Sequence, residues 1–120
     1  WRERNQTPLV RAYKQGLTRY GDYFSPDAMI EWVSAIRGKR TAQTLSDARL
    51  KFAADRADVD AALFQDKVKY TELLQTSRRI NASERALIGR YTTAFHKYFQ
   101  QKHGVAFKEW YAQFFGKFIS

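Results

Sequence analysis

Apolar side chains recur every three or four positions along most of this chain, which is the spacing of amphipathic α-helices. No stretch of four or more residues alternates between apolar and polar types, so we predict no β-strand. The pattern predicts an all-α fold, a four- to five-helix bundle with one long central helix. Because no internal repeat, low-complexity tract or linker interrupts the pattern, we expect residues 1–120 to form a single helical domain, a piece of a longer chain.

Proline marks the start of the first two predicted helices. Thr7-Pro8 and Ser25-Pro26 each place a capping hydroxyl before a proline at the first helical position, where the missing N–H costs nothing. We predict one helix from Thr7 to about residue 20 and a second from Ser25 to Gly38, a residue type that commonly ends helices. The apolar face of the first helix is formed by Leu9, Val10, Tyr13, Leu17 and Tyr20.

The central part of the chain carries one apolar stripe that includes Phe52 and keeps its phase at about 100° per residue, which predicts a long helix over about 45–78. Such a helix would be about 50 Å long, more than the diameter of a compact domain of this size. Either the bundle is elongated, or the helix breaks near 57–60, where Asp58 could cap a second piece. We favour continuity because the stripe keeps its phase.

Two further helices are predicted after the central one. Asn81-Ala82-Ser83-Glu84 has the form of a helix start, and Gly104 follows His103 as its end, which gives a helix over about 82–103. A last helix over about 106–118 carries six aromatic residues on one side, which predicts that it closes the core. These residues are Phe107, Trp110, Tyr111, Phe114, Phe115 and Phe118.

Composition removes several classes of function. The chain has no cysteine, which excludes a disulfide framework, a thiolate zinc site and a cysteine nucleophile. Its two histidines, His96 and His103, lie about 10.5 Å apart along one helix, too far to share a metal ion. The six glycines form no phosphate-binding loop. We therefore expect no catalytic residue, no metal and no cofactor.

The distribution of charge indicates a function more clearly than the candidate catalytic and metal-binding residues do. The formal net charge is +9, and residues 78–102 carry six cations against one acid, Glu84. An excess of this kind favours polyanionic partners. The outward arc of the helix at 82–103 offers cations, hydroxyls and an amide, the groups that contact phosphates and base edges.

We therefore predict a non-enzymatic domain that binds DNA or RNA through this arc and the adjacent basic loops. The predicted phosphate contacts are Arg78, Arg79, Arg85, Arg90 and Lys97, and the predicted base or sugar contacts are Thr92, His96 and Gln100. A second basic cluster, in the predicted loop between the second and third helices, is formed by Arg37, Lys39 and Arg40.

Two alternatives stay open. In one, the chain is a protein-interaction bundle, or an extracytoplasmic sensory or scaffold bundle, whose basic face binds an acidic protein. In the other it is an enzyme, which would require a pocket around Asp55 or Asp66 with a raised carboxylate pKa. No apolar run reaches the ~18–20 residues of a membrane span, so we expect no transmembrane segment, whereas a peripheral membrane contact stays open. The cytoplasm is the favoured location.

Overall fold

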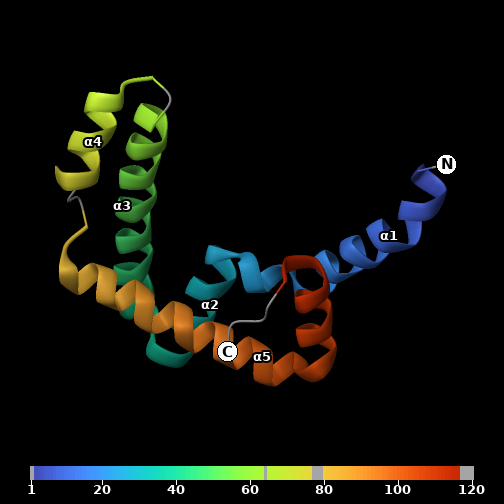
Figure 1. Ribbon diagram of the computed structural model, residues 1–120. Helices are drawn as coiled ribbons and strands as arrows, with labels where there is room; N and C mark the ends of the chain where they lie inside the picture. The colour runs from blue at the N-terminus through green and yellow to red at the C-terminus, as the bar shows by residue number, and fades with distance from the viewer. Residues whose placement is uncertain (1, 64, 77–79, 117–120) are drawn as a thin grey trace. The chain divides into compact units, whose positions relative to one another are not determined.

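The computed structural model describes residues 2–63, 65–76 and 80–116. Every regular element among them is helical, which confirms the predicted all-α class (Figure 1). In chain order the elements are α1 (Arg2–Tyr20), the 3-10 helix η1 (Gly21–Phe24), α2 (Pro26–Arg37), α3 (Lys39–Leu63), α4 (Lys67–Thr76) and α5 (Ala82–Phe115).

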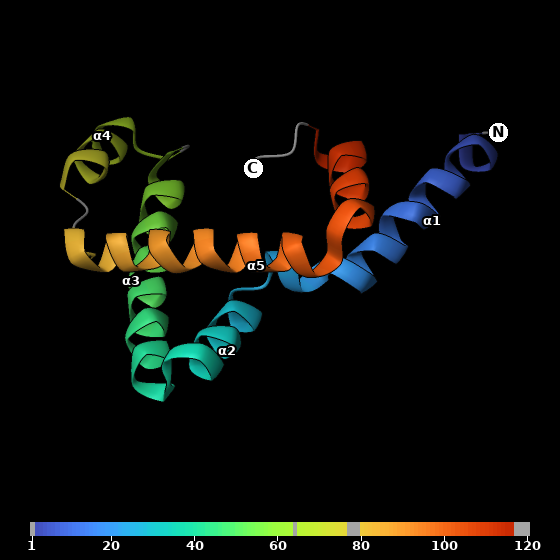
Figure 2. The same cartoon turned by 90° about the horizontal axis from the view of Figure 1, so that it is seen from below.

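The chain divides into two compact units. We call Trp1–Met29 together with Thr92–Ser120 the aromatic unit, because most of the aromatic residues belong to it. Ile30–Tyr91 is called the hairpin unit, because α3 and α4 lie side by side in it as a helical hairpin (Figures 1 and 2).

The first helix begins earlier than predicted. α1 starts at Arg2 and Pro8 lies inside it, so the predicted start at Thr7 is wrong. Proline at this position removes one backbone hydrogen bond, and the residues on both sides keep the helical conformation. The predicted apolar face is covered only in part, since Leu9 and Val10 are 51% and 44% exposed whereas Tyr20 is buried.

The second helix has the predicted bounds. The backbone N–H of Ala28 donates to Ser25 Oγ at 3.2 Å, and the N–H of Gly38 donates to the Ser34 carbonyl at 2.9 Å. Gly38 has a φ of 95°, a conformation that favours glycine, and α3 begins at the next residue. The predicted loop between the second and third helices is therefore a single residue.

That short connection changes the position of the second basic cluster. Arg37 is the last residue of α2, whereas Lys39 and Arg40 form the first turn of α3. All three residues are exposed. The cluster therefore lies on two helix ends and not in a loop.

The predicted long helix over 45–78 is wrong at both ends. α3 starts at Lys39, passes through 57–60 without a break, and is followed by a separate α4. Asp66 causes the interruption: its Oδ1 accepts the N–H of Lys69 at 3.0 Å, and its carbonyl accepts the N–H of Tyr70 at 2.8 Å. Asp66 is thus the exposed N-cap of α4, so it is not the buried acid that the enzyme alternative would require there.

The start of α5 is confirmed in detail. Asn81 Oδ1 accepts the N–H of Glu84 at 2.8 Å, and Glu84 Oε1 accepts the N–H of Asn81 at 3.2 Å, a reciprocal capping box. Gly104 interrupts the helix with φ 66° and ψ −149°, as predicted for a helix end, and the ribbon turns there (Figure 1). The second half ends at Phe115, and the predicted end near residue 118 lies outside the described residues.

Ring packing holds the aromatic unit together. Phe107 is completely buried, with ring centroids 5.1 Å from both Tyr20 and Phe99. Trp110 Nε1 donates to the Ala12 carbonyl of α1 at 3.2 Å, and its indole lies where a Cβ on Gly16 would be. This glycine is therefore required for the close approach of α1 to the second half of α5.

Apart from Tyr91, the buried apolar side chains described in the hairpin unit are aliphatic. Val33, Leu45 and Ala48 are completely buried, and Val59, Ala62 and Ile80 are nearly so. One carboxylate, Asp55 of α3, is buried with them. The two units thus differ in the size of their buried side chains as well as in their aromatic content.

Candidate functional site

The predicted nucleic-acid contacts are distributed over both compact units. Arg85 and Arg90 belong to the hairpin unit, together with the cluster Arg37, Lys39 and Arg40. Thr92, His96, Lys97 and Gln100 belong to the aromatic unit. Arg78 and Arg79 lie outside the described residues.

Within the aromatic unit, His96 and Gln100 are half-buried and both contact Tyr23. The His96 ring stacks on the Tyr23 ring with centroids 4.2 Å apart and planes at 21°, and it hydrogen-bonds to the Tyr23 backbone. The Gln100 side chain hydrogen-bonds to the Tyr23 side chain. The hydroxyl of Thr92 is also buried. Thr92, His96 and Gln100 are thus half-buried, whereas Lys97 is exposed.

Burial sets the ionisation of these groups. Desolvation lowers the pKa of His96, and the hydrogen bond to the Tyr23 backbone opposes this effect. Desolvation also raises the pKa of Tyr23, Tyr111 adds to the increase, and the Gln100 hydrogen bond opposes it. A neutral histidine against a neutral phenol is part of a packed core and has no charge to offer a phosphate.

His103 contacts other rings of the same aromatic packing, because Phe99 lies against both Tyr23 and His103. Its centroid lies 4.2 Å from Phe99 and 5.3 Å from Tyr20. Desolvation lowers its pKa, Lys102 and Arg19 lower it further, and Asp22 acts in the opposite direction. Across the described ranges, no group of three histidine or carboxylate side chains is arranged to hold a metal ion.

In the hairpin unit, the acid next to Arg85 in the sequence is Glu84, and this carboxylate is already ion-paired with another cation. Lys51 Nζ lies 2.8 Å from Glu84 Oε2, and Glu84 Oε1 also accepts the Asn81 N–H. The Lys51 hydrogen bond lowers the pKa of Glu84, and the same bond raises the pKa of Lys51. Glu84 is therefore neutralised by a cation from α3 and not by its neighbour Arg85.

Arg85 instead lies over an aromatic ring. Its Cζ is 6.0 Å from the centroid of Phe52 on α3, and the Phe52 side chain is 42% exposed. Among the residues that the structure describes, the ion pairs are Lys51–Glu84 and Arg56–Asp60, so neither Arg85 nor Arg90 is paired with a carboxylate there. Both arginines are exposed.

Further cations share this side of the hairpin unit. Arg40 and Lys51 are eleven residues apart on α3, which places them within about 20° around the helix and about 16.5 Å apart along it. One acid, Asp47, lies between them and accepts a hydrogen bond from Gln43 at 2.9 Å. Arg90, in contrast, is about 140° around α5 from Arg85 and faces another direction.

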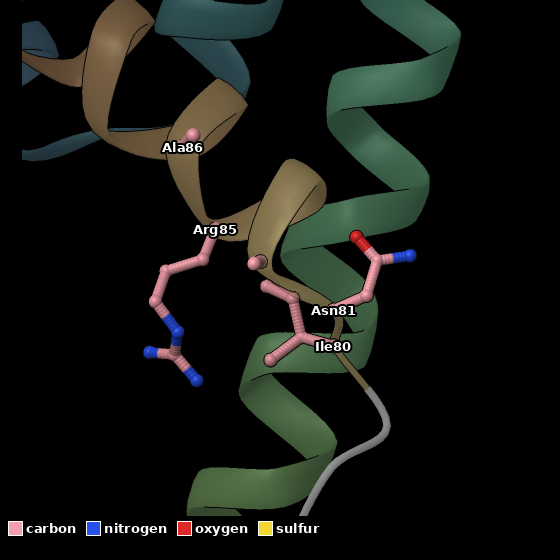
Figure 3. A pocket seen from close by; sticks show the side chains of 5 residues that line it. Ile80, Asn81, Arg85 and Ala86 are labelled. Carbon is pink, nitrogen blue, oxygen red and sulfur yellow. The ribbon is translucent and has the colours of Figure 1, made fainter.

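We call Arg85, Lys51, Phe52 and Arg40 the basic side of the hairpin unit. It places three cations with two acids, Asp47 and Glu84, and one exposed ring. Arg37 and Lys39 lie next to it in the chain, at the α2–α3 junction, and Lys39 is about 120° around α3 from Lys51. Beside Arg85 the surface is hollowed by about 570 Å³. Figure 3 shows the Arg85 and Ile80 side chains extending to the same side of this hollow and the Asn81 side chain extending to the other.

Sequence reasoning missed Phe52 and Lys51 as members of the site. Phe52 was assigned to the buried stripe of the central helix, and Lys51 was one of many cations. Their partners Glu84 and Arg85 come from α5, 33 residues further along the chain. Nothing in the local pattern indicates this contact.

Comparison with known proteins adds no relative to this description. No family model matches the chain, and no match was found among curated proteins or among solved structures. Of the helices that the structure describes, none has both the length and the apolar character that crossing a membrane requires. The site must therefore be interpreted from its own chemistry.

Proposed function

We propose that this chain is a non-enzymatic binding protein that contacts nucleic acid through the basic side of the hairpin unit. The observation that carries the proposal is the environment of Arg85. This exposed guanidinium lies over an exposed phenylalanine ring, and the neighbouring acid is paired with another residue. A cation in this state keeps its hydrogen-bond donors for an external anion.

Nucleic acid fits this chemistry better than a small anion does. A guanidinium offers donors in a planar fork that matches phosphate oxygens, and an exposed ring beside it offers a surface for a base. The distance of about 16.5 Å from Lys51 to Arg40 corresponds to about five phosphate steps along one strand of a duplex. Arg40, Lys39 and Arg37 are thus proposed as additional phosphate contacts.

The proposal is tested by the salt dependence of binding. Fluorescence anisotropy with a labelled oligonucleotide, measured between about 50 and about 200 mM salt, should show an affinity that falls steeply as salt rises. Arg85→Gln should weaken binding and reduce the slope of log K against log salt by about 0.7–0.9, the loss of one phosphate contact.

Arg56→Gln is the matched control, because Arg56 lies on α3 of the same unit and is paired with Asp60 at 3.3 Å. It removes the same formal charge and should change the slope much less. If the two variants behave alike, the effect is one of net charge and Arg85 has no special role. If no oligonucleotide binds at about 50 mM salt, the proposal is wrong.

A second function is favoured by exposed apolar side chains on the same unit. Leu50 and Ile36 are 67% and 43% exposed, and protein interfaces combine apolar and charged groups in this way. In this case the basic side would bind an acidic protein. Binding to bulk DNA at moderate salt separates the two proposals, since an acidic-protein site would hold DNA only weakly and without preference.

A further inference from the structure

The hollow beside Arg85 has a composition that differs from the rest of the basic side. Ile80, Asn81, Ala82, Arg85 and Ala86 line it, and its volume of about 570 Å³ lies in the range of small-ligand sites (Figure 3). Ala82 and Ala86 are one helical turn apart and have no side chain beyond Cβ, so they leave a flat apolar wall. Ile80, which is buried, adds to that wall.

The Asn81 and Glu84 side chains beside the hollow already have hydrogen-bond partners, whereas the Arg85 guanidinium has no carboxylate partner among the described residues. The Asn81 side chain and the Glu84 carboxylate bind each other's backbone N–H groups, so these two amides are not available to an anion. Glu84 is also bound to Lys51. Among the lining residues, Arg85 is the one charged group, and its guanidinium lies over Phe52.

This combination suits a flat aromatic ligand that carries a phosphate. A base could lie against the alanine wall and stack on the guanidinium plane, and arginine planes are known platforms for unpaired bases. The adjoining phosphate would then accept hydrogen bonds from Arg85. In a duplex the faces of each base are covered by its neighbours, so a duplex cannot place a base here without unstacking it.

We infer that the hollow beside Arg85 accepts an unpaired base, so that the basic side of the hairpin unit prefers single-stranded nucleic acid to duplex. The inference rests on the proposed function and adds to it the class of ligand. Because stacking contributes to affinity at each base, the preference for a single strand over a duplex of equal length should be about tenfold or more.

The experiment compares three labelled probes of equal length: an oligo-dT strand, a duplex, and a strand in which abasic sites replace the nucleosides at the centre. The abasic strand keeps the phosphates and lacks the bases, so it should bind about tenfold more weakly than oligo-dT. Ala86→Leu fills the hollow without changing charge, and leucine is compatible with the exposed helical position. It should weaken oligo-dT binding to the level of the abasic strand and leave duplex binding and the salt slope unchanged.

Ala61→Leu is the matched control on an exposed position of α3 in the same unit and should bind oligo-dT as the wild type does. Circular dichroism checks that both variants are folded. If the abasic strand and the duplex bind as tightly as oligo-dT, or if Ala86→Leu has no effect, the inference is overturned and the proposed function stands. If none of the three probes binds, the proposed function itself fails.

Discussion

Both compact units contain polar side chains of α5, but these side chains have different surroundings in the two units. In the aromatic unit, His96 and Gln100 are drawn into the ring packing by Tyr23. In the hairpin unit, Arg85 is exposed and not ion-paired with its neighbour Glu84, because Glu84 forms an ion pair with Lys51. The same helix therefore supplies half-buried polar groups to the ring packing of one unit and a surface arginine beside a paired acid to the other.

The difference shows that a polar residue on a helix is defined by what packs against it. Tyr23 offers an aromatic face, a backbone hydrogen-bond partner and a side-chain partner, and these compensate for the burial of two polar side chains. The hairpin unit offers Arg85 only a partly exposed ring. Its guanidinium thus remains available to a partner, whereas the histidine does not.

The largest effect is expected from Gly16 in the aromatic unit. In Gly16→Ala the new Cβ would overlap the Trp110 indole, which cannot move without losing its hydrogen bond to the Ala12 carbonyl. We expect a loss of about 3 kcal/mol in the free energy of unfolding, measured by urea denaturation.

Gly89→Ala in the hairpin unit is the matched control. Gly89 is exposed and has no atom within 4 Å of an added Cβ, so alanine should stabilise the helix by about 0.5–1 kcal/mol. We therefore expect Gly16→Ala to lower the free energy of unfolding and Gly89→Ala to raise it. A Gly16→Ala variant as stable as the wild type would contradict the tight packing of the aromatic unit.

A smaller effect is expected from the capping box of the hairpin unit. Asn81→Ala removes the acceptor of the Glu84 N–H and should cost about 1 kcal/mol in unfolding free energy. Thermal denaturation followed by circular dichroism measures it. Ser83→Ala, at an exposed position one residue from Glu84, is the control and should change stability little.

Sequence reasoning succeeded where local chemistry decides the structure. The Ser25 cap, the Asn81–Glu84 box and the break at Gly104 are each fixed by a few adjacent residues, and all three were predicted. It failed where the local pattern allowed more than one outcome. Thr7-Pro8 lies inside α1 and does not begin it, and Asp66 falls on the apolar stripe yet caps a separate helix, α4, which lies against α3.

The same distinction applies to the site. Arg85 was predicted from the charge of its arc, but its contact with Phe52 joins two helices that the pattern could not place together. His96 and Gln100 were predicted as outward because polar residues on a helix usually face water. Tyr23, which engages both, comes from η1, far away in the sequence.

A binding effect is expected from the Lys51–Glu84 pair. Lys51→Gln leaves the Glu84 carboxylate without its cation beside Arg85, so nucleic-acid affinity should fall by more than the loss of one charge explains. Lys69→Gln, at an exposed position of α4, is the control with the same charge change. Equal losses of affinity, measured by anisotropy, would show that the pair does not keep Arg85 available.

The smallest effect is expected from pH, and it should be confined to the aromatic unit. Burial lowers the folded-state pKa of His96 and His103 below the usual value of 6.5, so the unfolded chain binds protons more readily. The part of the unfolding free energy that depends on these neutral histidines is fully present above about pH 6.5, and it decreases as pH falls below that value. Urea denaturation at several pH values should show this decrease, and it should diminish in His96→Gln with His103→Gln. If the free energy of unfolding rises as pH falls from 7 to 5, the direction assigned to the two histidine pKa shifts is wrong.

The central claim is that the hairpin unit, and not the aromatic unit, meets nucleic acid. Titration of isotope-labelled protein with oligo-dT, followed by NMR, tests it residue by residue. The account predicts shifted amide signals at Lys51, Phe52 and residues 80–86, with little change at Phe99 and Phe107. Shifts gathered on the aromatic unit, with the signals of Arg85 and Phe52 unmoved, would contradict it.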